Sequence, residues 1–148
     1  MKFIVLKLLS FFDFFHKKKV IYGLKSILKN NNNIIFDVGA HHGESILFFK
    51  KKLGISRIFS FEPLKSNFYF LKKNTKNLKI YITYCNFALG CKKEQRNIKE
   101  MTETSSSTLN EINENSDYYK RKKFLLGLKK NESMYKERKI TIDKATNI

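Results

Sequence analysis

Three acidic residues and two glycines in the first half of the chain have the spacing of a nucleotide-binding turn. Asp37, Gly39, Gly43 and Glu44 lie close together, and Glu62 follows 25 positions after Asp37. Glycines let the backbone turn sharply and let a ligand approach the main chain. A carboxylate at the end of the next strand can accept hydrogen bonds from both hydroxyls of a ribose. The spacing therefore predicts a site for a cofactor that contains a nucleoside.

The charges around this turn indicate which cofactor fits. A dinucleotide places its pyrophosphate at a helix N-terminus, where amide donors and the helix dipole favour anions. Asp37 precedes the turn and Glu44 falls in the first helical turn, so two carboxylates would repel a pyrophosphate. S-adenosylmethionine carries no phosphate and has a cationic ammonium and sulfonium. The pattern favours this cofactor; the alternative is that Asp37 and Glu44 only cap the helix.

Other polar residues near the turn are open to more than one interpretation. Adjacent side chains such as His41 and His42 point in different directions, and no third ligand is evident close by in sequence. We therefore expect loop histidines beside the cofactor and no metal site. Asn86 follows the third expected strand and could bind the adenine edge or lie in a surface turn. Serines 105–107 could contact cofactor or substrate, or lie in a solvated loop.

Short alternating elements must position these residues. Strands are expected at 34–38, 57–61 and 78–84, and the first has the composition of a fully buried parallel strand. Helices are expected at 45–53, ended by Gly54, and at 64–74. This order with short joints predicts an α/β fold with a Rossmann-like, doubly wound parallel sheet.

The flanking sequence gives weaker signals. Residues 20–28 have the pattern of a short helix, and 88–90 of a turn that leads away from the third strand. Residues 92–139 are polar and charged, with one apolar patch at 124–128, and 139–142 resembles the start of a strand. Three or four strands are few for an open twisted sheet. We therefore expect a sheet that is truncated after its first three or four strands.

Composition limits the classes of partner. The formal net charge is +17, but the basic residues are mostly lysine, and the arginines are Arg57, Arg96, Arg121 and Arg138. Arginine is the side chain best suited to bidentate recognition of guanine and phosphate, so its scarcity argues against nucleic acid as the substrate. Weak, salt-sensitive attraction to polyanions is still expected. The cysteines, Cys85 and Cys91, fit a reducing compartment and cannot form a zinc site.

The first 30 residues form a separate N-terminal segment. Residues 1–15 are strongly apolar, too short for a transmembrane span, and followed by lysines where a signal-peptide cleavage site would stand. Polar residues spaced by three, three and four form one helical stripe, namely Lys7, Ser10, Asp13 and Lys17. We expect a helix packed on the sheet of a cytoplasmic protein. The alternative is peripheral membrane contact through residues 1–19.

The motifs together resemble one known family from about residue 33 to the end of the chain. They are similar to the FkbM-type methyltransferases, a branch of the class I S-adenosylmethionine-dependent fold. The matching segments, in chain order, are 36–44 (FDVGAHHGE), 61–63 (FEP), the helix at 67–74, 88–90 (ALG), the serines at 105–107 and 141–143 (TID).

The resemblance implies an O-methyltransferase that acts on a hydroxyl of a sugar, a polyketide or another small metabolite. It implies that Asp37, Gly39 and Gly43 contact the methionine part of the cofactor and that Glu62 binds the ribose. Ala40 and His41 lie in the same turn and join the predicted cofactor-binding set, as does Asn86. His41 stands where such proteins usually have asparagine, and the backbone is expected to do most of the binding there.

The resemblance also implies that residues 31–148 are an incomplete methyltransferase domain. The family usually continues past the Thr-Ile-Asp segment into a strand with a Lys-Ile-Asp-Val-Glu-Gly-like motif. Asp143 is a candidate for the catalytic base, but no catalytic residue is assigned. Two alternatives stay open: a split or inactive remnant that only binds the cofactor, and a basic nucleic-acid methyltransferase.

Overall fold

The structure, a computed structural model, describes residues 19–28, 34–102, 107–129 and 131–147. The expectations for the apolar segment 1–15, for its membrane contact and for Ser105 and Ser106 lie outside the described residues. Residues 19–27 are helical, as predicted. No helix in the described ranges is both long enough and apolar enough to cross a membrane.

The chain forms a mixed α/β fold whose first sheet is parallel. Its strands are β1 (Ile34–Val38), β2 (Arg57–Phe61) and β3 (Tyr81–Cys85), in the order β1-β2-β3. The first two strands have the predicted bounds, and β3 begins at Tyr81, three residues later than the predicted strand. The connecting helices are α2 (Glu44–Leu53), ended by Gly54 in a left-handed conformation, and α3 (Lys65–Thr75).

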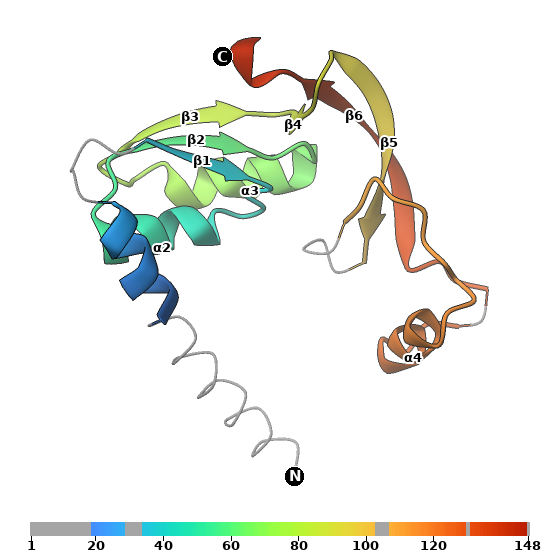
Figure 1. The fold of residues 1–148 in the computed structure, drawn as a ribbon. Coiled ribbons are helices and arrows are strands. Elements are labelled where there is room, and N and C mark those ends of the chain that lie inside the picture. Colours follow the sequence, from blue (N-terminus) through green and yellow to red (C-terminus); the bar gives the residue numbers. More distant parts are fainter. Residues whose placement is uncertain (1–18, 29–33, 103–106, 130, 148) are drawn as a thin grey trace.

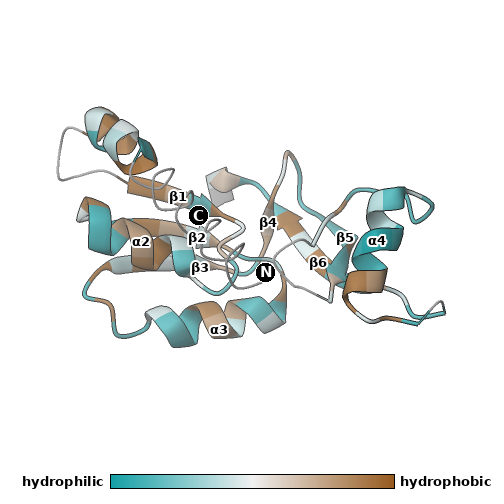
Figure 2. Cartoon of the chain, turned by 90° about the horizontal axis from the view of Figure 1, so that it is seen from below, coloured by the Kyte–Doolittle hydropathy of each residue, from teal (hydrophilic) through white to brown (hydrophobic). Residues whose placement is uncertain are grey.

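Both helices lie on the same face of this sheet (Figure 1). Two right-handed crossovers that step in the same direction along a sheet place their helices on one side. The core between helices and sheet contains Ile46, Ile58 and Leu71, which have no exposed surface. Figure 2 shows the apolar and polar stretches that alternate on α2 and α3. The apolar positions at helical spacing in α2 and α3 therefore pack against the apolar positions that alternate along the strands. Together they form one apolar layer.

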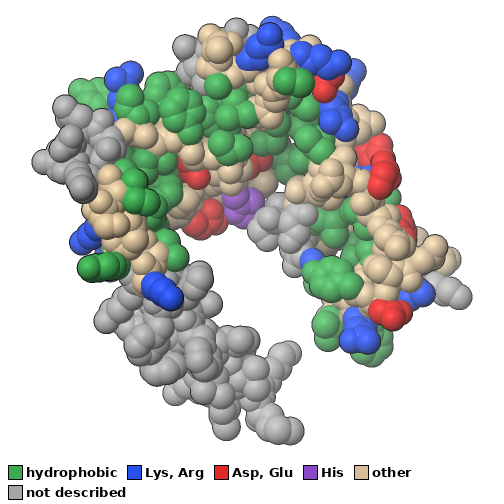
Figure 3. Space-filling model, in the orientation of Figure 1, with side chains coloured by type: hydrophobic (Ala, Val, Ile, Leu, Met, Phe, Trp, Pro, Cys, Tyr) green, Lys and Arg blue, Asp and Glu red, His purple; other side chains and the backbone are tan. Residues whose placement is uncertain are grey.

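The prediction that β1 is fully buried is wrong. Ile34, Phe36 and Val38 are 48%, 52% and 61% exposed, because they lie on the face of the sheet away from the helices. Phe36 stacks on Phe59 of β2, with ring centroids 5.0 Å apart, so this face is apolar and lined with aromatic rings. Figure 3 shows hydrophobic side chains over this part of the surface. A doubly wound sheet has helices on both faces, and the described helices cover only one.

The second sheet was not predicted. It consists of β4 (Ala88–Leu89), β5 (Glu94–Met101) and β6 (Tyr135–Asp143), in the order β4-β6-β5. The expected turn at 88–90 begins with β4, which pairs parallel to β6, and β6 starts four residues before the expected strand at 139. Strands β5 and β6 pair antiparallel over eight residue pairs.

The polar stretch 92–139 therefore holds more structure than its composition indicates. Besides β5 and part of β6, it contains α4 (Asp117–Leu125), whose N-cap Ser116 accepts a hydrogen bond from the Tyr119 amide. Only five of the 17 residues of β5 and β6 are buried, and neither strand carries a continuous apolar run. Small apolar clusters hold this part together, one of them Leu64, Ile98 and Ile140. The last element is a 3-10 turn, η2 (Ala145–Asn147).

Candidate functional site

The predicted turn and the predicted ribose acid meet at the carboxyl end of the parallel sheet. Val38 at the end of β1 is paired with Phe61 at the end of β2, so the residues that follow each strand are neighbours. The amides of Gly39 and Ala40 both donate to the Phe61 carbonyl, at 2.9 and 3.0 Å. The structure therefore brings together two segments that are more than twenty residues apart in sequence.

Each glycine of the turn has a distinct structural role. Gly39 and Gly43 have φ of 79° and 92°, values that residues with a side chain rarely adopt. A Cβ on Gly43 would lie 2.7 Å from Thr75 Cγ2, so this glycine is needed for α2 to pack against α3. A Cβ on Gly39 would meet nothing within 4 Å, so the main chain there faces open space.

The turn uses its own hydrogen-bond donors. All five main-chain amides from 39 to 43 donate to acceptors within the protein, which are Phe61 O, Glu62 Oε2, Glu44 Oε2 and Ala40 O. A pyrophosphate bound against a glycine-rich turn needs such amides as donors. The amides of this turn are therefore already paired, and the Glu44 carboxylate lies in the first turn of α2, beside them.

The two carboxylates that flank the turn differ in pKa. Burial raises the pKa of Asp37, and the nearby charge of Glu44 raises it further, although a 2.6 Å hydrogen bond from Ser45 Oγ opposes them. For Glu44, burial acts to raise the pKa, but hydrogen bonds from its own amide, the His41 ring and the His42 amide together lower it. Glu44 is thus stabilised as an anion, whereas ionised Asp37 is held at a cost in free energy.

Glu62 is the acid best placed to meet a ligand. It is only 5% exposed, and its two carboxylate oxygens accept hydrogen bonds from the amides of His41 and Leu64, each at 2.9 Å. A carboxylate has about four lone-pair sites, so each oxygen can still accept a hydroxyl donor. These two bonds fix the side chain, which makes Glu62 a preorganised acceptor.

Asn86 secures the loop that carries Glu62. Its Nδ2 donates to the carbonyls of Glu62 and Pro63, at 2.7 and 3.2 Å. This side chain therefore holds the main chain behind the acid, and a contact with adenine stays a prediction.

A cavity of about 370 Å³ opens beside Glu62, between the two sheets. Its volume falls within the range of small-molecule sites, which is roughly 300–1,000 Å³. Of the predicted residues, Gly39, His41 and Glu62 line it, whereas Asp37, Ala40, Gly43 and Asn86 are not part of its lining. The full lining is Val38, Gly39, His41, Phe61, Glu62, Pro63, Leu64, Asn67, Ala88, Leu89, Ile98, Ser107, Thr108 and Leu109.

Part of this lining could not be identified from the sequence. Asn67, 2% exposed in the first turn of α3, lines the cavity. The one signal in the sequence that could have identified it is its position shortly after the Glu-Pro pair. Ile98 and Leu109 come from the second sheet and its loop, within the stretch that composition indicated to be polar. Ser107 of the serine cluster lines the cavity as well. Asp143 is not part of the lining, and its Oδ2 lies 4.0 Å from Lys93 Nζ.

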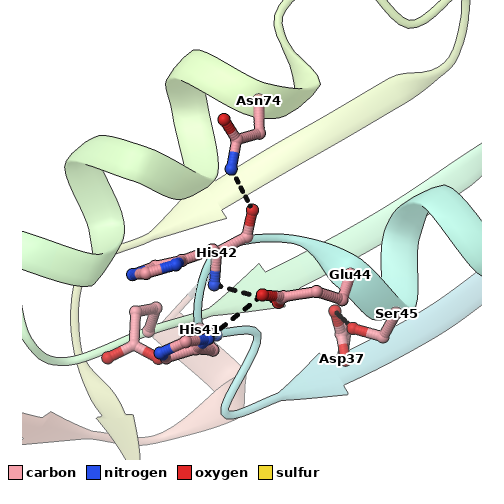
Figure 4. A network of polar contacts seen from close by, with 7 residues as sticks. Asp37, His41, His42, Glu44, Ser45 and Asn74 are labelled. Atoms are coloured by element: carbon pink, nitrogen blue, oxygen red, sulfur yellow. Dashed lines mark hydrogen bonds and ion pairs between the residues drawn. The ribbon is translucent and has the colours of Figure 1, made fainter. Parts of the chain in front are cut away.

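The expectation that His41 and His42 point in different directions is wrong. Their rings stack, with centroids 3.8 Å apart and an interplanar angle of 17°. Figure 4 shows both rings beside the Glu44 carboxylate, and His41 Nδ1 lies 3.3 Å from Glu44 Oε1. His41 has a φ of 49°, and this turn conformation brings the two rings together, whereas an extended backbone would separate them.

No family model matches this sequence, and comparisons with curated proteins and with solved structures found no match either.

Proposed function

We propose that this chain binds S-adenosylmethionine in the cavity beside Glu62 and is an FkbM-like class I methyltransferase with a Rossmann-like fold. The observation that carries the proposal is the position of Glu62. This buried acid, held by two amides, lines a cavity at the carboxyl ends of β1 and β2 together with Gly39. Ligands of open α/β sheets bind at this edge.

The chemistry of the surrounding groups supports a cationic cofactor. Glu62 accepts hydrogen bonds from the two hydroxyls of a ribose, and Gly39 leaves space for the cofactor against the main chain. Asp37 and Glu44 add negative charge near the turn, and its amides are already paired. A pyrophosphate against the turn would meet repulsion and find the five amides of residues 39–43 already paired, whereas an ammonium or a sulfonium is attracted.

S-adenosylmethionine, when bound, supplies an electrophilic methyl group, so the chain itself mainly has to hold and orient the two reactants. The apolar side chains of Leu64, Ile98 and Leu109 exclude water from one wall of the cavity. The acceptor we propose is a hydroxyl of a sugar or another small metabolite, by the family resemblance of the motifs.

Isothermal titration of the full chain with S-adenosylhomocysteine and with NAD⁺ tests the proposal. We expect saturable binding of S-adenosylhomocysteine and at least about tenfold weaker binding, or about 1.4 kcal/mol, in Glu62→Ala. Glu137→Ala on β6, the same change at an exposed acid outside the cavity, is the matched control and should bind like the parent. Tighter binding of NAD⁺, or equal affinity of the Glu62→Ala variant and the parent, would overturn the proposal.

Two alternative functions would give different results in methyl-transfer and RNA-binding assays. Binding of S-adenosylhomocysteine without methyl transfer from labelled S-adenosylmethionine to any hydroxyl acceptor would favour a protein that only binds the cofactor. The net charge of +17 motivates the second, a nucleic-acid methyltransferase. RNA binding that survives high salt would support it, whereas a steep fall in affinity with salt indicates nonspecific attraction to phosphates.

A further inference from the structure

The turn between β1 and α2 gathers three potential metal ligands on its outer side. One ligand atom each of His41, His42 and Glu44 lies within 4.8 Å of the others. The histidines are half-buried, and Glu44 is exposed. Figure 3 shows histidine side chains at the surface with acidic side chains close by.

Hydrogen bonds fix the main chain that carries the two histidines and hold the Glu44 carboxylate beside it. The His41 amide is bound to Glu62 Oε2, and Asn74 Nδ2 donates to the His42 carbonyl at 2.9 Å. The His42 amide donates in turn to Glu44 Oε2 at 3.2 Å (Figure 4). A main chain that is held in place before the ion arrives loses less conformational entropy on binding, so only side-chain rotation remains.

We propose that His41, His42 and Glu44 form a binding site for a divalent transition-metal ion. Two imidazole nitrogens and one carboxylate oxygen are a donor set that suits Zn²⁺, which binds such ligands with a further position left for water. Mg²⁺ and Ca²⁺ prefer oxygen ligands and fit this set poorly. The site goes beyond the proposed cofactor binding and does not depend on it.

Coordination requires a small rearrangement of side chains. The lone pairs of the imidazole nitrogens lie in the ring planes, and the planes of His41 and His42 are nearly parallel. One ring must therefore turn about its Cβ–Cγ bond before both nitrogens point at one ion. Because neither ring is fully buried, this rotation needs no change in the core. The Nδ1 atom of His41 already lies 3.3 Å from Glu44 Oε1.

Titration of the untagged full chain with Zn²⁺ alone tests the site, with the absorption spectrum of bound Co²⁺ as a second readout. We expect one ion per chain, with the affinity lowered at least about tenfold, or about 1.4 kcal/mol, in His42→Gln and in Glu44→Gln. Circular dichroism checks that both variants are folded, and the exposed position of Glu44 makes its substitution mild.

Matched controls separate this site from other metal-binding residues. His16→Gln removes the remaining histidine of the chain, and Cys91→Ser removes the exposed cysteine. Both should leave the affinity for Zn²⁺ unchanged. Absence of saturable Zn²⁺ binding would overturn the proposal. So would parental affinity in His42→Gln and Glu44→Gln, or binding that is lost in either control.

Discussion

The main-chain amide of His41 donates a 2.9 Å hydrogen bond to the buried carboxylate of Glu62, which lies 21 residues further along the chain. The other oxygen of the same carboxylate accepts the amide of Leu64. Glu62 therefore closes the turn after β1 onto the end of β2 and also fixes the entry to α3. One side chain both shapes the proposed site and belongs to its binding surface.

Replacement of Glu62 by glutamine keeps the size and shape of the side chain but changes its hydrogen-bonding groups. The glutamine amide has one acceptor oxygen, so one of the two main-chain amides faces an NH₂ group and loses its partner. An unsatisfied buried group costs about 1–3 kcal/mol, and we expect Glu62→Gln to lower the free energy of unfolding by that amount. Urea denaturation measures it. Glu137→Gln, an exposed change of the same chemistry, should leave the free energy of unfolding near the parent value.

Asp37→Asn should stabilise the protein at neutral pH. The pKa of Asp37 is raised above its usual 3.8 in the folded state, with burial as the main cause. The stability contribution of protonated Asp37 is fully present below the unfolded pKa and is lost as pH rises through the folded pKa. Asparagine stays neutral and keeps an oxygen for the Ser45 hydroxyl. The melting temperature of the variant should exceed that of the parent near pH 7.

A pH series checks the sign of this effect. The difference in melting temperature between Asp37→Asn and the parent should shrink as pH falls toward the usual aspartate pKa of 3.8. A difference that is the same at every pH would contradict the raised pKa. The proposed function further predicts that Asp37→Asn binds S-adenosylhomocysteine more weakly than the parent does, although the variant is the more stable protein.

The two glycines of the turn should respond differently to alanine. Gly39→Ala carries only the cost of a positive φ, about 1–2 kcal/mol, since its Cβ would meet no atom within 4 Å. Gly43→Ala adds a contact of 2.7 Å with Thr75 Cγ2 and should lose more stability. Urea denaturation of both variants gives the comparison. Equal losses would indicate that α2 and α3 move apart without cost.

The exposure of β1 predicts that shortening a side chain on its outer face costs less stability than shortening a buried side chain on β2. Ile58 on β2 is fully buried beneath the helices, and Ile58→Ala should cost about 2–5 kcal/mol of folding free energy. Val38 on β1 is 61% exposed, and Val38→Ala should stay within about 0.5 kcal/mol of the parent. Chemical denaturation measures both. A large loss in Val38→Ala would mean that its face of the sheet is covered in solution.

Local pattern was sufficient for the elements around the site. Short apolar runs bounded by Gly and Asn predicted β1, β2 and the bounds of α2 closely, because such strands and helices are specified by residues near in sequence. The same pattern brought Gly39 and Glu62 to one edge of the sheet. It could not predict β5 and α4, whose polar surfaces carry little periodic signal and which depend on pairing and packing with distant residues.

The sequence by itself determined the βαβ units, the glycine turn and the acids that follow β1 and β2, since all of these rest on short-range spacing. Tertiary structure alone decided that one face of β1 is exposed and that Ile98 and Leu109 line the cavity. It also decided that His41 and His42 stack beside Glu44. The physical reason is that burial and ligand geometry depend on backbone torsions and on contacts between distant segments, and residue order does not encode these locally.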